Sequence, residues 1–329
     1  MSSQYDVVVI GGGAAGLAGA VALARSRRSV LVIDAGAPRN APADGVHNFL
    51  TREGTPPAEL YALGRAEVTG YGGEVVCGHV AAVSRDGEGN SFTVTLADGS
   101  EARARRLLVT TGAADELPDI AGLAERWGHD VLHCPFCHGW ESRDRAIGIL
   151  GTGPMAVHAT LLWRQISPDV VLFQHTAPPL TPEQAEQLAV LGVPVVNGEV
   201  AELVITGDHL SGVRMRNGDV IPREIIVAAS VVHAHAELLA GLGVAPEPLE
   251  IGGQVVATRL IPGLVGATDV PGVWVAGNVA DPMGQVITAA ADGMRAGAAI
   301  NMDLINEDTA TAVAAHRAAN SALAVAGAG

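Results

Sequence analysis

The strongest constraint on the fold is a glycine-rich turn between two apolar segments near the start of the chain. A β-branched run at 5–10 leads into Gly-Gly-Gly-Ala-Ala-Gly at 11–16, and an Ala/Leu-rich segment continues to about Arg25. A second run at 29–33 ends in Asp34. Strand, G-x-G-x-x-G, helix, strand and acid in this order form the complete dinucleotide-binding pattern. The alternative, a mere glycine-rich turn, leaves the second strand and the acid unexplained.

Each part of this pattern has a predicted role. Gly11 makes the tight turn, Gly13 lets the backbone approach a pyrophosphate, and Gly16 allows close helix–strand packing. The helix N-terminus attracts the pyrophosphate, and Asp34 accepts hydrogen bonds from ribose hydroxyls. The loop after Asp34 is either a plain surface loop or lies along the cofactor. Further expected cofactor contacts are Ala14, Ala15, Ala35, Arg39, Asn40, His47 and Val80.

The pattern recurs in the middle of the chain. A strand-like run at 146–150 precedes Gly-Thr-Gly-Pro-Met-Ala at 151–156, then a helical stretch to about Gln165 and a strand at 170–173. A repeated βαβ turn predicts a second nucleotide-binding-type unit, and 329 residues are too many for one ordinary core. Residues 74–112 read as β-strands with a hairpin turn at Asp-Gly, an insertion typical of flavoproteins.

The second unit lacks the charges that a pyridine nucleotide needs. NADPH requires an arginine for its 2′-phosphate, and NADH requires an acid for its ribose. Here the second strand runs into Gln-His-Thr-Ala-Pro at 174–178, and no Lys or Arg occurs between Gln165 and Val213. Either His175 contacts a phosphate, or the unit keeps its fold without tight NADPH binding.

The segment His-Cys-Pro-Phe-Cys-His-Gly-Trp at 133–140 holds two of the three cysteines. A C-x-x-C at a helix start favours the thiolate, and the adjacent His138 can carry the proton that thiol–disulfide exchange moves. Zinc held by the two cysteines and the flanking histidines is disfavoured, because adjacent ligands make poor tetrahedral geometry. Two inert core cysteines are the other alternative. Cys77 has no partner in the sequence and is interpreted as structural.

The net charge of the chain argues against two classes of binding partner. The net charge is −15, and all 20 basic residues are Arg, which argues against nucleic acid and anionic membranes. The uncharged stretch 7–24 is broken by glycines, so we do not expect it to span a membrane. No charged segment precedes it, so we expect no signal peptide and a cytoplasmic protein, where a C-x-x-C is more often catalytic than structural.

The C-terminal region predicts one more part of the cofactor site. A strand at 273–276 ends in Gly277-Asn278, and a helix N-terminus at Gln285–Val286 would present backbone N–H groups to an anionic ring oxygen. A small-residue helix is expected from Thr288 to Met302. The Ala-rich tail beyond Glu307 is expected to be helical and to offer a dimer contact.

In this order, the motifs resemble the low-molecular-weight thioredoxin reductase family over nearly the whole chain. The resemblance implies two Rossmann-like (ββα three-layer) α/β domains. The FAD domain would be discontinuous, at 1–117 and 246–329, and an NAD(P)H-binding-like domain at 118–245 would carry the C-x-x-C. It places FAD against Thr111-Gly112, Gly277-Asn278 and Gln285-Val286, in addition to the first motif. Cys137 would be the sulfur next to the flavin, and Cys134 the one that exchanges with substrate.

The departures from that family point to one branch. His138 replaces the usual Asp, Asn278 replaces Asp, Gly284 replaces Arg, and the His-Arg-Arg segment for NADPH is missing. The string Cys-Pro-Phe-Cys-His-Gly-Trp-Glu is similar to that of the dithiol oxidases of gliotoxin- and holomycin-type biosynthesis. These are homodimers that use FAD and molecular oxygen without NADPH.

The resemblance therefore implies oxidation of a small dithiol to a disulfide, with hydrogen peroxide as the second product. The substrate dithiol would attack Cys134, its second thiol would release the disulfide product, and the Cys137 thiolate would reduce FAD, with His138 as acid and base. Three alternatives stay open: an NADPH-dependent disulfide reductase, a flavin-bound redox sensor without turnover, and reduction by a protein such as ferredoxin.

Overall fold

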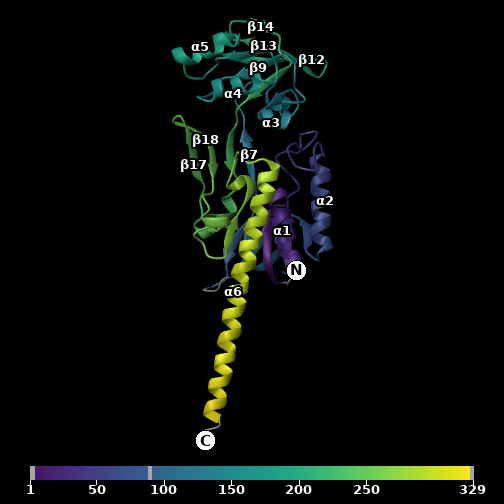
Figure 1. Ribbon diagram of the computed structural model, residues 1–329, viewed down its shortest axis with the longest axis vertical. Coiled ribbons are helices and arrows are strands. Elements are labelled where there is room, and N and C mark those ends of the chain that lie inside the picture. Colours follow the sequence, from purple (N-terminus) through teal and green to yellow (C-terminus); the bar gives the residue numbers. More distant parts are fainter. Residues whose placement is uncertain (1–3, 88–90, 327–329) are drawn as a thin grey trace.

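The computed structural model describes residues 4–87 and 91–326, and the side chains as far as Ser321. Two α/β units lie one above the other, joined by extended segments, and one long helix runs away from the lower unit (Figure 1). The predicted α/β fold with two Rossmann-like units is confirmed.

The lower unit is built on a seven-stranded sheet that takes strands from both ends of the chain. In spatial order the strands are β3 (Glu74–Cys77), β2 (Val30–Asp34), β1 (Gln4–Ile10), β6 (Glu101–Val109), β5 (Phe92–Leu96) and β4 (Val80–Arg85), with β19 (Val273–Val275) paired to β6. The α-helices of this unit, within the described residues, are α1 (Ala14–Arg25), α2 (Pro57–Gly70) and α6 (Val286–Ala326).

Alternation along β1 explains why the sheet is covered on both faces. Val7 and Val9 belong to one core, with residues of α1, α2 and α6, whereas Val8 and Ile10 belong to the core on the other face. Successive side chains of a strand point to opposite faces, so a fully apolar strand needs two covering layers.

The upper unit has a parallel five-stranded sheet and a small antiparallel one. The parallel sheet runs β11 (Val195–Val196), β10 (Val170–Phe173), β9 (Ile147–Leu150), β15 (Ile225–Ala228) and β8 (Val131–Leu132). The antiparallel sheet is β12 (Val200–Thr206), β13 (His209–Met215) and β14 (Val220–Ile221), and the helices are α3 (Pro135–His138), α4 (Ala156–Arg164) and α5 (Pro182–Val190). The strand, turn, helix and strand predicted from 146 to 173 are present.

A four-stranded sheet joins the two units. Its order is β17 (Glu247–Ile251), β18 (Gln254–Arg259), β16 (Val231–Ala234) and β7 (Ala113–Glu116). Leu239, which follows β16, is buried in the core around β4, β5 and β6. Residues that follow β16 therefore pack against the lower unit.

Helix α6 is longer than the predicted segment from Thr288 to Met302. It starts at Val286 and continues without a break through the Ala-rich tail. Every residue from Asp308 to Ser321 is exposed, and Figure 1 shows this part extending beyond the body.

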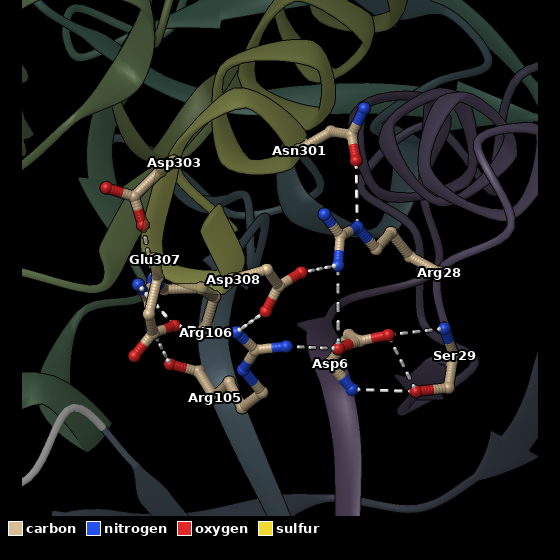
Figure 2. Close-up of polar contacts among 9 residues, drawn as sticks. All are labelled: Asp6, Arg28, Ser29, Arg105, Arg106, Asn301, Asp303, Glu307 and Asp308. Atoms are coloured by element: carbon tan, nitrogen blue, oxygen red, sulfur yellow. Dashed lines mark hydrogen bonds and ion pairs between the residues drawn. The ribbon is translucent and has the colours of Figure 1, made fainter. Parts of the chain in front are cut away.

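An ion-pair network fixes α6 where it leaves the body (Figure 2). Arg106 is almost fully buried and contacts Asp303 at 2.5 Å and Glu307 at 3.0 Å. Further pairs join Arg28 and Arg105 to Asp6, Glu307 and Asp308. Buried or shared charges of this kind are costly unless paired, so the network holds the helix in one position.

Among the helices of the described residues, none is long and apolar enough to cross a membrane.

Candidate active site

A large cavity lies at the carboxyl ends of the parallel strands of the lower sheet. The turn after β1, the end of β2, the residues after β6 and the start of α6 line it, and so does the C-x-x-C segment of the upper unit. Its volume of about 1350 Å³ exceeds the roughly 300–1,000 Å³ of ordinary small-molecule pockets. Crevices at this edge of an open α/β sheet are where dinucleotides bind.

The predicted site residues come together in this one cavity, with a single exception. Gly16 does not line it. The residues that do are Gly11, Gly13, Ala14, Ala15, Asp34, Ala35, Arg39, Asn40, His47, Val80, Thr111, Gly112, Cys134, Cys137, His138, Gly277, Asn278, Gln285 and Val286.

The first glycine-rich turn fits a pyrophosphate. Gly11 has a φ of +109°, and a Cβ there would lie 2.3 Å from the Thr110 carbonyl oxygen. A Cβ on Gly16 would lie 1.9 Å from the Gly11 oxygen, which explains its place outside the cavity, whereas a Cβ on Gly13 would meet nothing within 4 Å. Helix α1 begins without a side-chain cap, so its first N–H groups are free to bind an anion.

Asp34 is fixed by the same turn. Its Oδ1 accepts hydrogen bonds from the backbone N–H groups of Gly12 at 3.2 Å and Gly36 at 3.1 Å. The carboxylate is thereby held at the end of β2, where a ribose would lie. Together with the open space at Gly13, this shows that the residues present fit FAD.

Two polar residues of the loop after Asp34 have partners within the protein. Arg39 makes a bidentate pair with Asp115, both contacts at 2.6 Å, and donates to the Pro282 carbonyl at 3.1 Å. Asn40 accepts a hydrogen bond from Tyr61. Burial alone would raise the pKa of Asp115, but hydrogen bonds from Arg39 and Ser230 lower it overall. Arg39 therefore lines the cavity with its guanidinium group already paired with Asp115.

The strand-end pairs Thr111-Gly112 and Gly277-Asn278 are also held by backbone groups. The Thr111 hydroxyl donates to the His235 carbonyl at 2.6 Å. The Asn278 amide donates to the carbonyls of Asp281 at 2.8 Å and Gly284 at 2.9 Å. A carboxylate cannot donate to two carbonyls, so this turn gives a local reason for Asn where the related reductases have Asp.

The two cysteines lie at the cavity end of the upper unit. Cys134 is the N-cap of the short helix α3, and its Sγ lies 2.7 Å from that of Cys137. A hydrogen bond from Cys137 lowers the pKa of Cys134 to about 7, assisted by the backbone N–H groups of Cys137 and Phe136 and by Gln285 at 3.9 Å. The same hydrogen bond raises the pKa of Cys137. In the reduced pair, Cys134 therefore carries the negative charge and Cys137 the proton.

This difference predicts the pH dependence of thiol alkylation. Only thiolates react with iodoacetamide, so Cys134 should be alkylated half-maximally near pH 7, well below the ordinary range for cysteine, and more slowly at lower pH. Cys137 should react only at much higher pH. Mass spectrometry of alkylated peptides from the reduced protein measures both. Equal midpoints for the two cysteines would contradict the assignment.

Burial keeps the neighbouring histidines neutral. It lowers the pKa of His138, and the nearby His47 lowers it further. Burial also lowers the pKa of His133, whose Nδ1 lies 3.3 Å from the Ala228 carbonyl. A neutral imidazole at pH 7 can accept the proton of an attacking thiol. In the described part of the chain, no group of three or more His, Cys, Asp or Glu side chains is arranged to hold a metal ion.

The second glycine-rich turn is covered by another part of the chain. A Cβ on Gly153 would lie 2.6 Å from Oε1 of Gln254, and one on Gly252 would lie 2.9 Å from the Pro154 ring. Both Gln254 and Gly252 lie at the tip of the β17–β18 hairpin, which points toward α4 (Figure 1). His175 is engaged too, because its Nδ1 accepts the Val200 N–H at 3.1 Å. Sequence patterns gave no sign of this hairpin contact.

Comparison with known proteins fits this geometry. The sequence profile of the pyridine nucleotide-disulphide oxidoreductase family matches residues 5–293. The chain belongs to this family. It is a flavin-dependent disulfide oxidoreductase.

Its relatives support the resemblance found in the sequence. The chain is 29% identical to thioredoxin reductase sirT of Leptosphaeria maculans, over 94% of this chain and 97% of that protein. It is 33% identical to thioredoxin reductase tcpT of Claviceps purpurea, over 53% of this chain and 56% of that protein. The solved structure of HlmI is 45% identical, with a TM-score of 0.87 over 95% of this chain and 96% of that one. The resemblance to thioredoxin reductase-like enzymes is confirmed.

Proposed function

We propose that this enzyme is a dithiol oxidase. It closes an intramolecular disulfide in a small dithiol through Cys134 and Cys137, with FAD as cofactor, molecular oxygen as electron acceptor and hydrogen peroxide as product. One dithiol and one oxygen molecule give one cyclic disulfide and one peroxide, so no pyridine nucleotide is consumed.

The covered second turn is the observation that carries the proposal. A pyridine nucleotide would place its pyrophosphate above Gly153, where a Cβ would lie 2.6 Å from Gln254 Oε1. The strand that follows supplies no arginine, and His175 is already hydrogen-bonded. The first cavity, in contrast, extends to both sulfur atoms. These observations favour the entry of electrons through the cysteines over their entry through a bound nicotinamide. The similarity to HlmI over nearly the whole chain supports the same branch.

The protein's own residues perform the thiol exchange. A substrate thiolate attacks the Cys134–Cys137 disulfide, forming one mixed S–S bond and releasing one cysteine thiolate. The second substrate thiol then attacks the mixed disulfide, which releases the cyclic product and the second cysteine. His138, kept neutral by burial, accepts a thiol proton. Bound FAD would supply the electron acceptor that reoxidises the pair and passes two electrons to oxygen.

The cavity near the sulfur atoms favours a neutral substrate. The side chains lining this end include His47, His133 and His138, and the nearby Arg39 is closed in its pair with Asp115. Among the described residues that line this end, no arginine is left unpaired to bind an acidic group, so a small uncharged dithiol is the class that fits best.

We also propose that the enzyme is a homodimer. Apart from packing on the body near its start, α6 exposes every residue from Asp308 to Ser321, and an isolated Ala-rich helix of this length is only marginally stable in water. We propose that a second copy of the chain packs against this exposed part of α6. Sedimentation of a chain truncated after Glu307 tests this: the truncated protein should be monomeric. The predicted cytoplasmic location, and the absence of nucleic-acid and membrane partners, stay predictions.

An anaerobic titration tests the function. A small dithiol such as dithiothreitol should bleach the flavin of the purified enzyme within the turnover time, and NADPH at the same concentration should not. On admission of air, peroxide and oxidised dithiol should form in equal amounts. Rapid bleaching by NADPH would instead identify a disulfide reductase. No bleaching and no peroxide with any dithiol would identify a flavin-bound sensor.

A further inference from the structure

The loop from Val46 to Thr55 in the lower unit is closed and braced. The Val46 N–H donates to the Thr55 carbonyl at 2.8 Å, and the Gly54 N–H donates back to the Val46 carbonyl at 2.9 Å. Inside the loop, the Glu53 carboxylate contacts His47 Nδ1 at 2.6 Å and accepts the Asn48 N–H at 2.9 Å. Asn48 has a φ of +59°, in the left-handed region that Asn tolerates better than most residues. The loop therefore presents the Asn48 side chain in a defined direction.

That side chain reaches the cysteine pair of the other unit. Asn48 Nδ2 donates to the Phe136 carbonyl at 2.6 Å. Beside it, His47 Nε2 lies 3.7 Å from a carboxylate oxygen of Glu141, the residue that directly follows the C-x-x-C segment. Helix α3 has only four residues, and so short a helix leaves carbonyls without helical partners. Asn48 supplies such a partner from outside the helix.

The Phe136 carbonyl belongs to the same peptide group as the Cys137 N–H. That N–H donates to the Cys134 carbonyl at 3.2 Å, which closes the turn that holds the two sulfur atoms 2.7 Å apart. A hydrogen bond to the carbonyl fixes the peptide plane and polarises the N–H on its other side. Asn48, the 136–137 peptide and the Cys134 carbonyl thus form one chain of hydrogen bonds that crosses from the lower unit to the upper one.

We propose that Asn48 is a positioning residue for the cysteine pair: its side-chain amide holds the Phe136–Cys137 peptide, and with it the turn that keeps the Cys137 thiol against Cys134 Sγ. The inference deepens the proposed function, since it concerns the same thiols. It also gives the contact between the units a chemical role, because the thiolate is fully stabilised only while the loop and α3 touch.

Two substitutions at Asn48 distinguish the hydrogen bond of its side-chain amide from the conformation of the loop backbone. Asn48→Gly keeps the left-handed backbone and removes the amide, and Asn48→Asp keeps the side-chain shape but cannot donate. Leu50→Ala is the matched control, because Leu50 is an 82% exposed residue of the same loop that does not line the cavity. All three are made in a Cys77→Ser background, so that alkylation reports on the pair alone.

The readout is the pH profile of Cys134 alkylation in holoenzyme reduced under anaerobic conditions. In Asn48→Gly the midpoint should rise by about half a unit, which slows alkylation at pH 7 roughly twofold. Asn48→Asp should shift it further, because a nearby carboxylate also repels the thiolate. Thermal midpoints of the holoenzyme should stay unchanged, and flavin reduction by dithiothreitol should slow in the same order. Leu50→Ala should match the unmodified enzyme in each measurement.

An unshifted alkylation midpoint in both Asn48 variants would overturn the proposal, whatever happens to turnover. A shift of the same size in Leu50→Ala would overturn it as well, because the effect would then come from the loop as a whole. Alkylation requires only free thiols, so the result holds even if no dithiol proves to be a substrate. The failure of the proposed function and the failure of this inference are therefore distinguishable.

Discussion

Replacing either cysteine of the pair with serine should lower dithiol oxidation by about a thousandfold or more, the scale seen when a covalent nucleophile is removed. FAD should stay bound, because the pyrophosphate and ribose contacts lie at the first glycine-rich turn, away from the sulfur atoms. Peroxide formation with dithiothreitol and the flavin absorbance of the purified variants measure the two effects. Cys77→Ser is the matched control and should keep full activity, since Cys77 is an exposed residue at the end of β3. Full activity in Cys137→Ser would rule out the proposed chemistry.

The same two variants identify the sulfur next to the flavin. The family resemblance gives that place to Cys137, so Cys134→Ser should show the long-wavelength absorbance that a thiolate beside an oxidised flavin produces. The contact between Cys134 and Gln285 favours the opposite order. Absorbance in Cys137→Ser alone would therefore reassign the flavin side to Cys134, and with it the sulfur that the substrate attacks.

Local patterns were sufficient to predict the fold and most of the site. The order of strand, glycine-rich turn, helix and acid fixes β1, α1, β2 and Asp34, because each step is set by residues close in sequence. The strand ends at Thr111 and Gly277 could be placed for the same reason. Parallel strands then bring these ends to one edge, so separate motifs meet in one cavity.

Contacts between distant segments could not be predicted in this way. Nothing near Asn48 indicates that it will bond to Phe136, and nothing near Gln254 indicates that it will cover Gly153. Both contacts depend on how the two units are oriented, which no local periodicity encodes. The length of α6 was underestimated for a related reason: an Ala-rich tail favours a helix, but its continuity with the core helix depends on the anchoring network around Arg106.

The glycine roles predicted from the sequence can be separated by two alanine substitutions, Gly13→Ala and Gly16→Ala. Gly13 has an ordinary φ of −78°, and its Cβ would enter open space. Alanine there should leave the unfolding free energy of the apoprotein within about 0.5 kcal/mol. The added methyl would fill the space meant for the pyrophosphate, so FAD affinity should fall roughly 10- to 100-fold, or about 1–3 kcal/mol.

Gly16→Ala, in contrast, should destabilise the folded protein itself, whether or not FAD is bound. Its Cβ would lie 1.9 Å from the Gly11 oxygen and 2.6 Å from Thr110 Oγ1, so α1 must move away from the sheet. Such overpacking should destabilise even the apoprotein, by about 3 kcal/mol. Gly70→Ala, at the open end of α2, is the control and should change neither property. Thermal unfolding of apoprotein and an FAD titration measure both quantities. If Gly13→Ala bound FAD as tightly as the unmodified chain, the pyrophosphate would have to lie elsewhere, and the first glycine-rich turn would be a fold element rather than a binding site.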